Sequence, residues 1–144
     1  MNSPILVGFD GSDGAERALA FAVAQARSGN CALRLVAVVE WQFFGVQNPM
    51  ELAAVEESVG ADIERYRSEV LGPRCSALRD EGIEASFEVA TGAVVPALEK
   101  AAEACGAGQI IVGRRGRSRL SKLLLGSVSS ALVQSAAVPV TVVP

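Results

Sequence analysis

The sequence predicts an α/β domain in which an open, five-stranded parallel sheet carries helices on both faces. Short apolar runs recur along the chain without polar alternation, which is typical of strands buried on both faces. Segments with helical spacing separate these runs, and such alternation produces right-handed crossovers between parallel strands. The chain has 144 residues, 50% of them hydrophobic, so residues 1–144 are expected to form a single domain.

The first two strands flank a helix. The runs "PILVGF" (4–9) and "CALRLVAVV" (31–39) predict these strands. Between them lies an Ala- and Leu-rich segment that begins with Asp13 and Glu16, spaced as in a capping box, and closes at Gly29. This segment is expected to be the first helix.

An apolar stripe at helical spacing predicts the second helix. From Glu51 onward, apolar residues recur at spacings of 3, 4, 4, 3 and 4. They are Leu52, Val55, Val59, Ile63, Tyr66 and Val70. The pair Gly72–Pro73 is expected to stop or kink this helix, because proline lacks an N–H and its ring clashes with the previous turn. A shorter helical piece is expected to continue to Glu81.

The rest of the chain repeats the alternation of strands and helices. An apolar connection at 41–50 is longer than most βα loops, and its aromatic residues form either a lid or partner surface, or a cluster packed on the sheet end. These aromatics are Trp41, Phe43 and Phe44. In order, we then expect a strand at 82–90, a helix at about 93–105, a strand at 108–112, a helix from Ser127 to about Ala136, and a last strand at 138–143.

Charge and composition exclude several classes of protein. The net charge is −3, yet no acidic residue follows Glu103, and the five bases beyond it all lie within residues 114–122. This basic patch is too narrow for duplex nucleic acid, but it attracts small anions. Histidine is absent, which removes Ser-His-Asp and Cys-His catalysis. No apolar run is long enough to span a membrane and no signal peptide is evident, so we expect a cytoplasmic protein with no membrane contact and reduced cysteines.

Ligands of open parallel sheets bind beyond the carboxyl ends of the strands, where the winding direction reverses. The loop after the first strand holds three glycines spaced G-x-x-G-x-x-G, which is not the G-x-G-x-x-G of dinucleotide-binding folds. They are Gly8, Gly11 and Gly14. Asp10 and Asp13 also place carboxylates where a pyrophosphate would lie, so this loop is not expected to bind NAD. Asp10 remains available to a ribose, a base or a metal, and Glu40 ends the second strand where a ribose-binding acid is expected.

The loop after the fourth strand has the opposite character. It reads "GRRGRSRLSKLLLGS" over residues 113–127, which is not a Walker A sequence. Gly113 and Gly116 permit close approach to the backbone, and Gly126–Ser127 opens a helix whose first N–H groups favour an anion. The hydroxyl and basic groups nearby are Ser127, Ser129, Ser130, Arg114, Arg115, Arg117, Arg119 and Lys122. The alternative is a tight turn whose arginines are solvated.

These residues resemble the ATP-binding branch of the universal stress protein family, which is marked by G-x-x-G, nine residues and G-[ST]. Gly113, Gly116, Gly126 and Ser127 match this motif, with residues 117–125 as the nine, and the resemblance covers the whole chain. It implies a Rossmann-like sheet of order 3-2-1-4-5, similar to adenine-nucleotide alpha-hydrolase-like folds. It also implies ATP, with or without magnesium, at the carboxyl ends of the first and fourth strands.

The resemblance implies roles for ten residues. Val38 and Val112 are expected to flank the adenine, and Asp10 to lie near the ribose and phosphates. Arg115 stands where relatives often have histidine. Around the ribose and phosphates we expect the backbones of Gly113 and Gly116, followed by Gly126, Ser127, Val128 and Ser129. Two departures from the family are Gly8, in place of a common proline, and Gly72–Pro73, within a helix that relatives run through.

The expected function is that of an ATP-binding regulatory module of the stress response, which changes a contact with an unknown protein partner when nucleotide binds. The family implies a homodimer formed through strand 138–143, whose edge nothing in the sequence covers. Efficient catalysis is not expected, because phosphoryl transfer needs a positioned base and organised metal ligands. Two alternatives remain: a slow nucleotide hydrolase or nucleotidyl-transferring enzyme on the same scaffold, and a protein-interaction scaffold that binds cyclic AMP.

Overall fold

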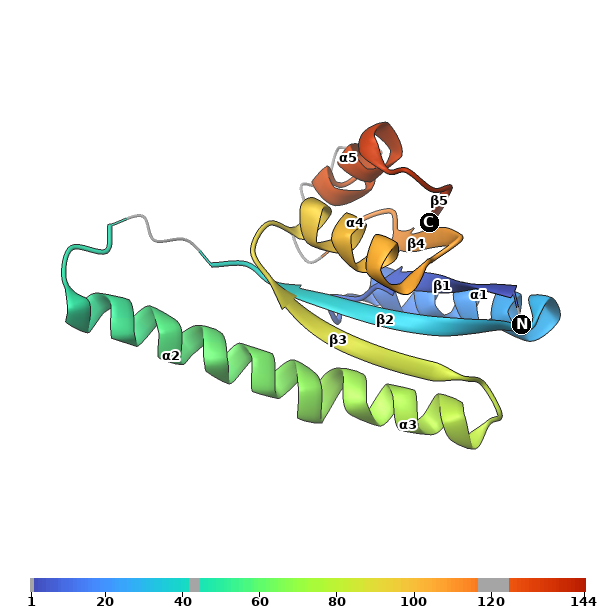
Figure 1. The fold of residues 1–144 in the computed structure, drawn as a ribbon, viewed down its shortest axis with the longest axis horizontal. Helices are drawn as coiled ribbons and strands as arrows, with labels where there is room; N and C mark the ends of the chain where they lie inside the picture. Colours follow the sequence, from blue (N-terminus) through green and yellow to red (C-terminus); the bar gives the residue numbers. More distant parts are fainter. Residues whose placement is uncertain (1, 42–44, 117–124) are drawn as a thin grey trace.

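The structure, a computed structural model, describes residues 2–41, 45–116 and 125–144. These residues form a five-stranded sheet of order β3-β2-β1-β4-β5, in which all neighbouring strands are parallel (Figure 1). The predicted fold class and strand order are confirmed. The strands are β1 (Asn2–Gly8), β2 (Cys31–Val39), β3 (Ala85–Thr91), β4 (Gln109–Gly113) and β5 (Val140–Val143). The helices are α1 (Asp13–Gly29), α2 (Pro49–Arg65), α3 (Gly72–Asp80), α4 (Val94–Cys105) and α5 (Ser127–Ser135), with a π-helical segment, η1 (Tyr66–Leu71), between α2 and α3.

Helices cover both faces of the sheet, which explains why the apolar runs lack polar alternation. Figure 1 shows α4 and α5 on one side of the sheet and the α2–η1–α3 rod on the other. Alternate residues of β1 serve the two sides. Ile5 and Val7 belong to the core under α1 and the rod, whereas Leu6 belongs to the core under α4 and α5.

The start of α1 differs from the prediction by one residue. Ser12, not Asp13, is the N-cap, because Ser12 Oγ accepts a hydrogen bond from the Ala15 N–H at 3.1 Å. Asp13 is the first helical residue, where a carboxylate complements the positive end of the helix dipole. The capping box predicted to begin at Asp13 is therefore wrong.

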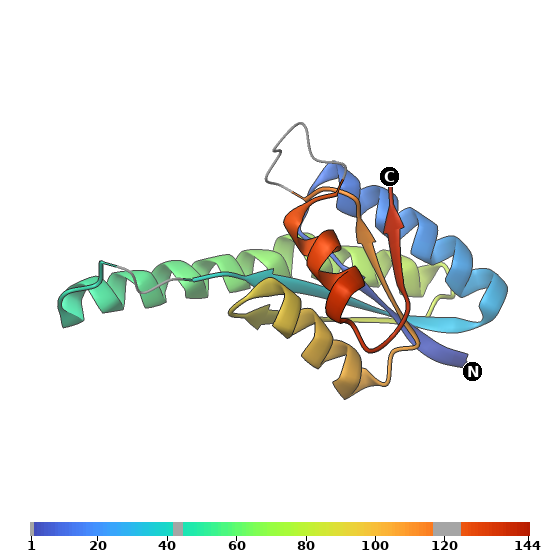
Figure 2. The ribbon, with the colours of Figure 1, turned by 90° about the horizontal axis from the view of Figure 1, so that it is seen from above.

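The second helix begins earlier than predicted, at Pro49. Asn48 caps it through a hydrogen bond from the Glu51 N–H to Asn48 Oδ1 at 2.9 Å, and Glu51 Oε2 accepts from the Gln47 N–H at 2.6 Å. These two bonds resemble a capping box, but the carboxylate accepts from the residue before the N-cap instead of from the N-cap itself. Figure 2 shows the N-terminal part of α2 projecting beyond the sheet. No residue of α2, which is described throughout, is fully buried, although Val59 and Ile63 pack against the core.

The helix was predicted to stop or kink at Gly72–Pro73: it does not stop there, and the predicted shorter helical piece is present as α3, which ends at Asp80. The rod continues through η1 into α3, and the interruption takes the form of a π-helical turn just before the pair (Figure 1). The Gly72 N–H bonds to the carbonyl oxygen of Arg67, five residues back, and a Cβ on Gly72 would collide with that oxygen. Glycine is therefore required at this position.

Two strands, β3 and β5, begin later than predicted. β3 starts at Ala85 instead of residue 82, and β5 starts at Val140 instead of residue 138. β5 forms one edge of the sheet, beside β4. Among the described residues, no helix is both long and apolar enough to cross a membrane.

Candidate functional site

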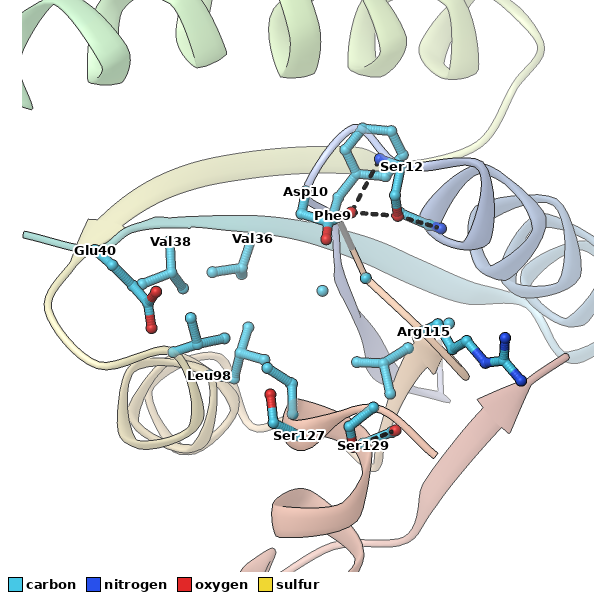
Figure 3. A pocket seen from close by; sticks show the side chains of 18 of the residues that line it. Phe9, Asp10, Ser12, Val36, Val38, Glu40, Leu98, Arg115, Ser127 and Ser129 are labelled. Carbon is cyan, nitrogen blue, oxygen red and sulfur yellow. Dashed lines mark hydrogen bonds between the residues drawn. The ribbon is translucent and has the colours of Figure 1, made fainter. Parts of the chain in front are cut away.

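A cavity of about 420 Å³ opens at the carboxyl ends of the strands, between the loop after β1 and the loop after β4 (Figure 3). This is where the winding direction of the sheet reverses, because β1 and β4 are neighbours. All ten residues to which the family resemblance assigns roles line this cavity. They are Asp10, Val38, Val112, Gly113, Arg115, Gly116, Gly126, Ser127, Val128 and Ser129.

One half of the cavity is apolar. Val36 and Val38, two residues apart on β2, face α4, and Leu98 of α4 lies across from them (Figure 3). Val112 of β4 joins this wall, and a Cβ on Gly8 would be 3.0 Å from its Cγ1. Glycine at position 8 thus leaves the apolar wall free of a further side chain. Such a surface suits a flat aromatic ring.

The other half of the cavity contains the N-terminus of α5. Gly126 is the N-cap, and no side chain of the described residues caps this helix. Ser127 and Val128, the first two helical residues, line the cavity, and the hydroxyl of Ser127 points into it (Figure 3). The first N–H groups of a helix lack intrahelical partners and lie at the positive end of its dipole. This end of the cavity therefore favours an anion.

Ser129 holds the loop after β4 against the start of α5. It is only 2% exposed, and its Oγ lies 2.9 Å from the carbonyl oxygen of Arg114 and 3.1 Å from that of Gly126. The Gly126 N–H donates to the same Arg114 oxygen at 2.8 Å. The hydroxyl hydrogen of Ser129 is thus engaged within the protein, and its donor role is to join two segments of the site.

The glycines of the two loops serve packing as well as access. A Cβ on Gly113 would be 2.7 Å from the carbonyl carbon of Gly14, at the start of α1. A Cβ on Gly116 would be 2.7 Å from Asp10 Oδ2. Real Cβ atoms do not approach other atoms so closely. The absence of a side chain at these two positions therefore allows the loop after β4 to pack against the loop after β1. From the sequence, Gly113 was expected to leave room for a ligand. The side of Gly113 that lacks a Cβ faces the start of α1, so the missing side chain makes room for that helix.

Asp10 is held in place at the junction of the two loops. Its Oδ1 accepts hydrogen bonds from the Ser12 N–H at 3.0 Å and from Ser12 Oγ at 2.5 Å. The Tyr66 hydroxyl donates to the Asp10 carbonyl oxygen at 3.4 Å, which connects η1 to this loop. Asp13, predicted beside Asp10, is not among the residues that line the cavity.

Arg115 contributes mainly backbone to the cavity. In Figure 3 its guanidinium group points away from the hollow, toward the side of β5 and α1. Its Nε is buried with no hydrogen-bond partner among the described residues. The described residues also contain no group of three or more His, Cys, Asp or Glu side chains that could hold a metal ion.

Part of the cavity wall was not predicted from the sequence. Tyr66 lay within the apolar stripe of the second helix, and Leu98 lay in a helix without a motif. Glu40 was noted only as a possible ribose-binding acid of a dinucleotide fold. Asp62, Arg65 and Val94 also line the wall without having been predicted. The predicted roles of Phe43, Phe44, Arg117, Arg119 and Lys122 concern positions outside the described residues.

Comparison with known proteins identifies relatives of the whole chain. The chain matches the profile of the Universal stress protein family over residues 1–144. Universal stress protein Rv2005c of Mycobacterium tuberculosis is 32% identical over an alignment of 156 residues, gaps included. The alignment covers 98% of this chain and 45% of that protein. The chain thus spans about half the length of the curated relatives it matches.

Solved structures share the fold. Universal stress protein UspA from Lactobacillus plantarum has a TM-score of 0.86 at 22% identity, with 99% of this chain and 97% of that chain covered. A universal stress protein solved in complex with cAMP has a TM-score of 0.70 at 25% identity, with coverage of 99% and 97%.

Proposed function

The chain belongs to the universal stress protein family, and from this premise we propose that it binds an adenine nucleotide, ATP above all, in the cavity between β1 and β4. The observation that carries the proposal is that an apolar wall and a helix N-terminus, which no side chain of the described residues caps, open into one cavity. An adenine ring suits the first and a phosphate chain the second. The relative solved with cAMP supports an adenine nucleotide and makes cyclic AMP the second candidate.

The ligand has one orientation that satisfies both halves of the cavity. The adenine lies between Val38 and Val112, the ribose near Asp10, and the phosphates at the start of α5, around Ser127. Magnesium would arrive with the phosphates of ATP, and Asp10 supplies a carboxylate of the type that magnesium accepts. In this proposal the protein is a nucleotide-dependent regulatory module of the cytoplasmic stress response.

A homodimer through β5 is part of the proposal. Among the described strands β5 pairs with β4 alone, and its four residues are all partly exposed. An uncovered strand edge favours pairing with another chain. Light scattering on the purified protein tests this part, and a monomeric mass at micromolar concentration would overturn it.

Nucleotide binding is tested by Ser127→Asp. Ser127 is exposed at the first position of α5, so an aspartate there stabilises the helix by its charge while repelling phosphates. We expect calorimetry to show ATP binding weakened by about tenfold or more, with the melting temperature unchanged or raised. Ser58→Asp is the matched control, because Ser58 is exposed on α2 and does not line the cavity. The proposal fails if the folded wild type shows no heat with ATP, ADP or cyclic AMP, or if Ser127→Asp binds ATP as the wild type does.

A further inference from the structure

We propose that Glu40 selects the base of the nucleotide by accepting a hydrogen bond from the exocyclic amino group of adenine, an inference that rests on the proposed function. Glu40 directly follows β2, is exposed, and lines the cavity. Val36 and Val38 face α4, and Glu40 is the next residue in the same two-residue repeat. In Figure 3 its carboxylate turns into the hollow beside Val38, with Leu98 opposite.

The charges of the α5 N-terminus and of Glu40 determine which end of the ligand lies at which end of the cavity. The N-terminus of α5 attracts phosphate, whereas the Glu40 carboxylate repels it. The end of the ligand that lies against Glu40 must therefore be neutral and must donate hydrogen bonds, because an ionised carboxylate only accepts them. In an adenine nucleotide only the amino group of the base and the ribose hydroxyls donate. The proposed function places the ribose beside Asp10, which leaves the amino group for Glu40.

This contact discriminates between purines. Hypoxanthine and guanine carry a carbonyl oxygen where adenine carries its amino group. With the base in the same position, that oxygen would face the Glu40 carboxylate as acceptor against acceptor, and the N1–H donor of a 6-oxopurine could reach the carboxylate only if the base shifted in the cavity. A site that hydrogen-bonds a ligand donor rejects analogues that lack it, because its own polar group is then left unpaired. Glu40 therefore favours 6-amino over 6-oxo purine nucleotides.

The experiment compares two ligands that differ only in this donor. ATP and the triphosphate of purine riboside, which has hydrogen in place of the amino group, are titrated into the wild type, Glu40→Gln and Glu40→Ala. We expect the wild type to bind ATP about tenfold more tightly than the purine riboside nucleotide, as for one hydrogen bond to a charged group at a partly exposed site. Glu40→Ala is expected to bind both equally. Glu40→Gln, which keeps a carbonyl acceptor, is expected to retain part of the preference.

The ratio of the two affinities is the decisive quantity, because removing a negative charge strengthens binding of any anion and affects both ligands alike. Glu57→Ala removes an exposed carboxylate from α2, outside the cavity, and is expected to keep the wild-type ratio. If the wild type binds both nucleotides equally, or if Glu40→Ala keeps the preference for ATP, this inference is overturned while the proposed function stands. If the wild type binds neither nucleotide, both are overturned.

Discussion

Gly14 and Gly113 lie backbone against backbone, at the start of α1 and the end of β4. A Cβ on Gly113 would be 2.7 Å from the carbonyl carbon of Gly14 and 2.8 Å from its oxygen, and a Cβ on Gly14 would be 2.5 Å from the carbonyl oxygen of Arg115. This contact brings the loop after β1 and the loop after β4 to the same side of the cavity. The site therefore depends on two positions that carry no side chain.

Replacing Gly113 by alanine is expected to destabilise the protein by about 1–3 kcal/mol, as overpacking does in a close-packed interior. The atoms that the new methyl group would meet belong to the backbone of α1, which cannot yield without moving the helix. Urea denaturation measures the effect. Gly60→Ala is the control: apart from its chain neighbours and the adjoining backbone of α2, no described atom lies within 4 Å of its Cβ position, so the change is expected to stabilise by about 0.5–1 kcal/mol. Equal stability of the two variants would contradict this prediction.

Removing the cap of α1 with Ser12→Ala is expected to cost about 1 kcal/mol. Ser12 Oγ accepts from the Ala15 N–H and donates to Asp10 Oδ1, so the change also removes one hydrogen bond to the Asp10 side chain, while the bond from the Ser12 N–H is kept. Thermal and urea unfolding measure the loss. Ser12→Thr keeps the hydroxyl and is expected to stay near the wild type, and a threonine variant as unstable as the alanine variant would argue against capping as the cause.

Ser129→Ala is expected to destabilise by about 0.5–1.5 kcal/mol, the value of one ordinary hydrogen bond. The Arg114 carbonyl oxygen keeps its bond from the Gly126 N–H, so the loop is weakened but not released. The comparison variant is Ser130→Ala, whose hydroxyl makes no recorded hydrogen bond within the described part of the chain. Since alanine is the better helix former, Ser130→Ala should be neutral or slightly stabilising. Equal losses from the two variants would show that the Ser129 hydroxyl does not hold the loop.

Cys75 gives the stability a dependence on alkaline pH. It is fully buried, burial raises the pKa of its thiol above the ordinary 9.0, and the positive charges of Arg79 and Arg34 oppose the rise. A thiol whose pKa is higher in the folded state stabilises the fold fully below the unfolded-state pKa, and this contribution is lost as pH rises through the folded-state pKa. Above pH 9 the free energy of unfolding of the wild type should therefore fall more steeply than that of Cys75→Ala.

Denaturation curves at several pH values from 7 to 11 measure this difference in slope. Cys105→Ala is the matched control, since it removes a thiol that is only partly buried. Parallel slopes for the wild type and Cys75→Ala would contradict the prediction.

The fold was predictable because its signals are local. Leu6 and Val7 are adjacent and both fully buried, one on each side of the sheet, and this produces the unbroken apolar run that predicts β1. The predicted start of β3, at residue 82, was wrong because of one hydrogen bond. Ile83 is buried, which makes residues 82–84 resemble a strand, but its N–H bonds to the Leu78 carbonyl oxygen at the end of α3. The sequence pattern indicates that Ile83 is buried, but it does not indicate which group the Ile83 N–H bonds to.

The loop after β4 was the part of the candidate site that the spacing of residues in the sequence indicated most directly. The glycine and serine positions of the loop after β4 are close in sequence, so their spacing alone predicted that they form one anion-binding site. Tyr66 reaches Asp10 only because η1 follows α2, and Leu98 reaches Val38 only because α4 packs across the sheet. Both depend on tertiary arrangement, which apolar spacing within one helix does not reveal.

The π-helical turn η1 separates two helical phases along one rod. Because such a turn takes up one residue more than an α turn, the side chains before and after it are not in register with each other. The orientation of Cys75 and Leu78 toward the sheet is fixed downstream of the turn, whereas the reach of α2 beyond the sheet is fixed upstream. Evolution can therefore lengthen, shorten or recompose the projecting half of α2 without rotating the hydrophobic interior out of place.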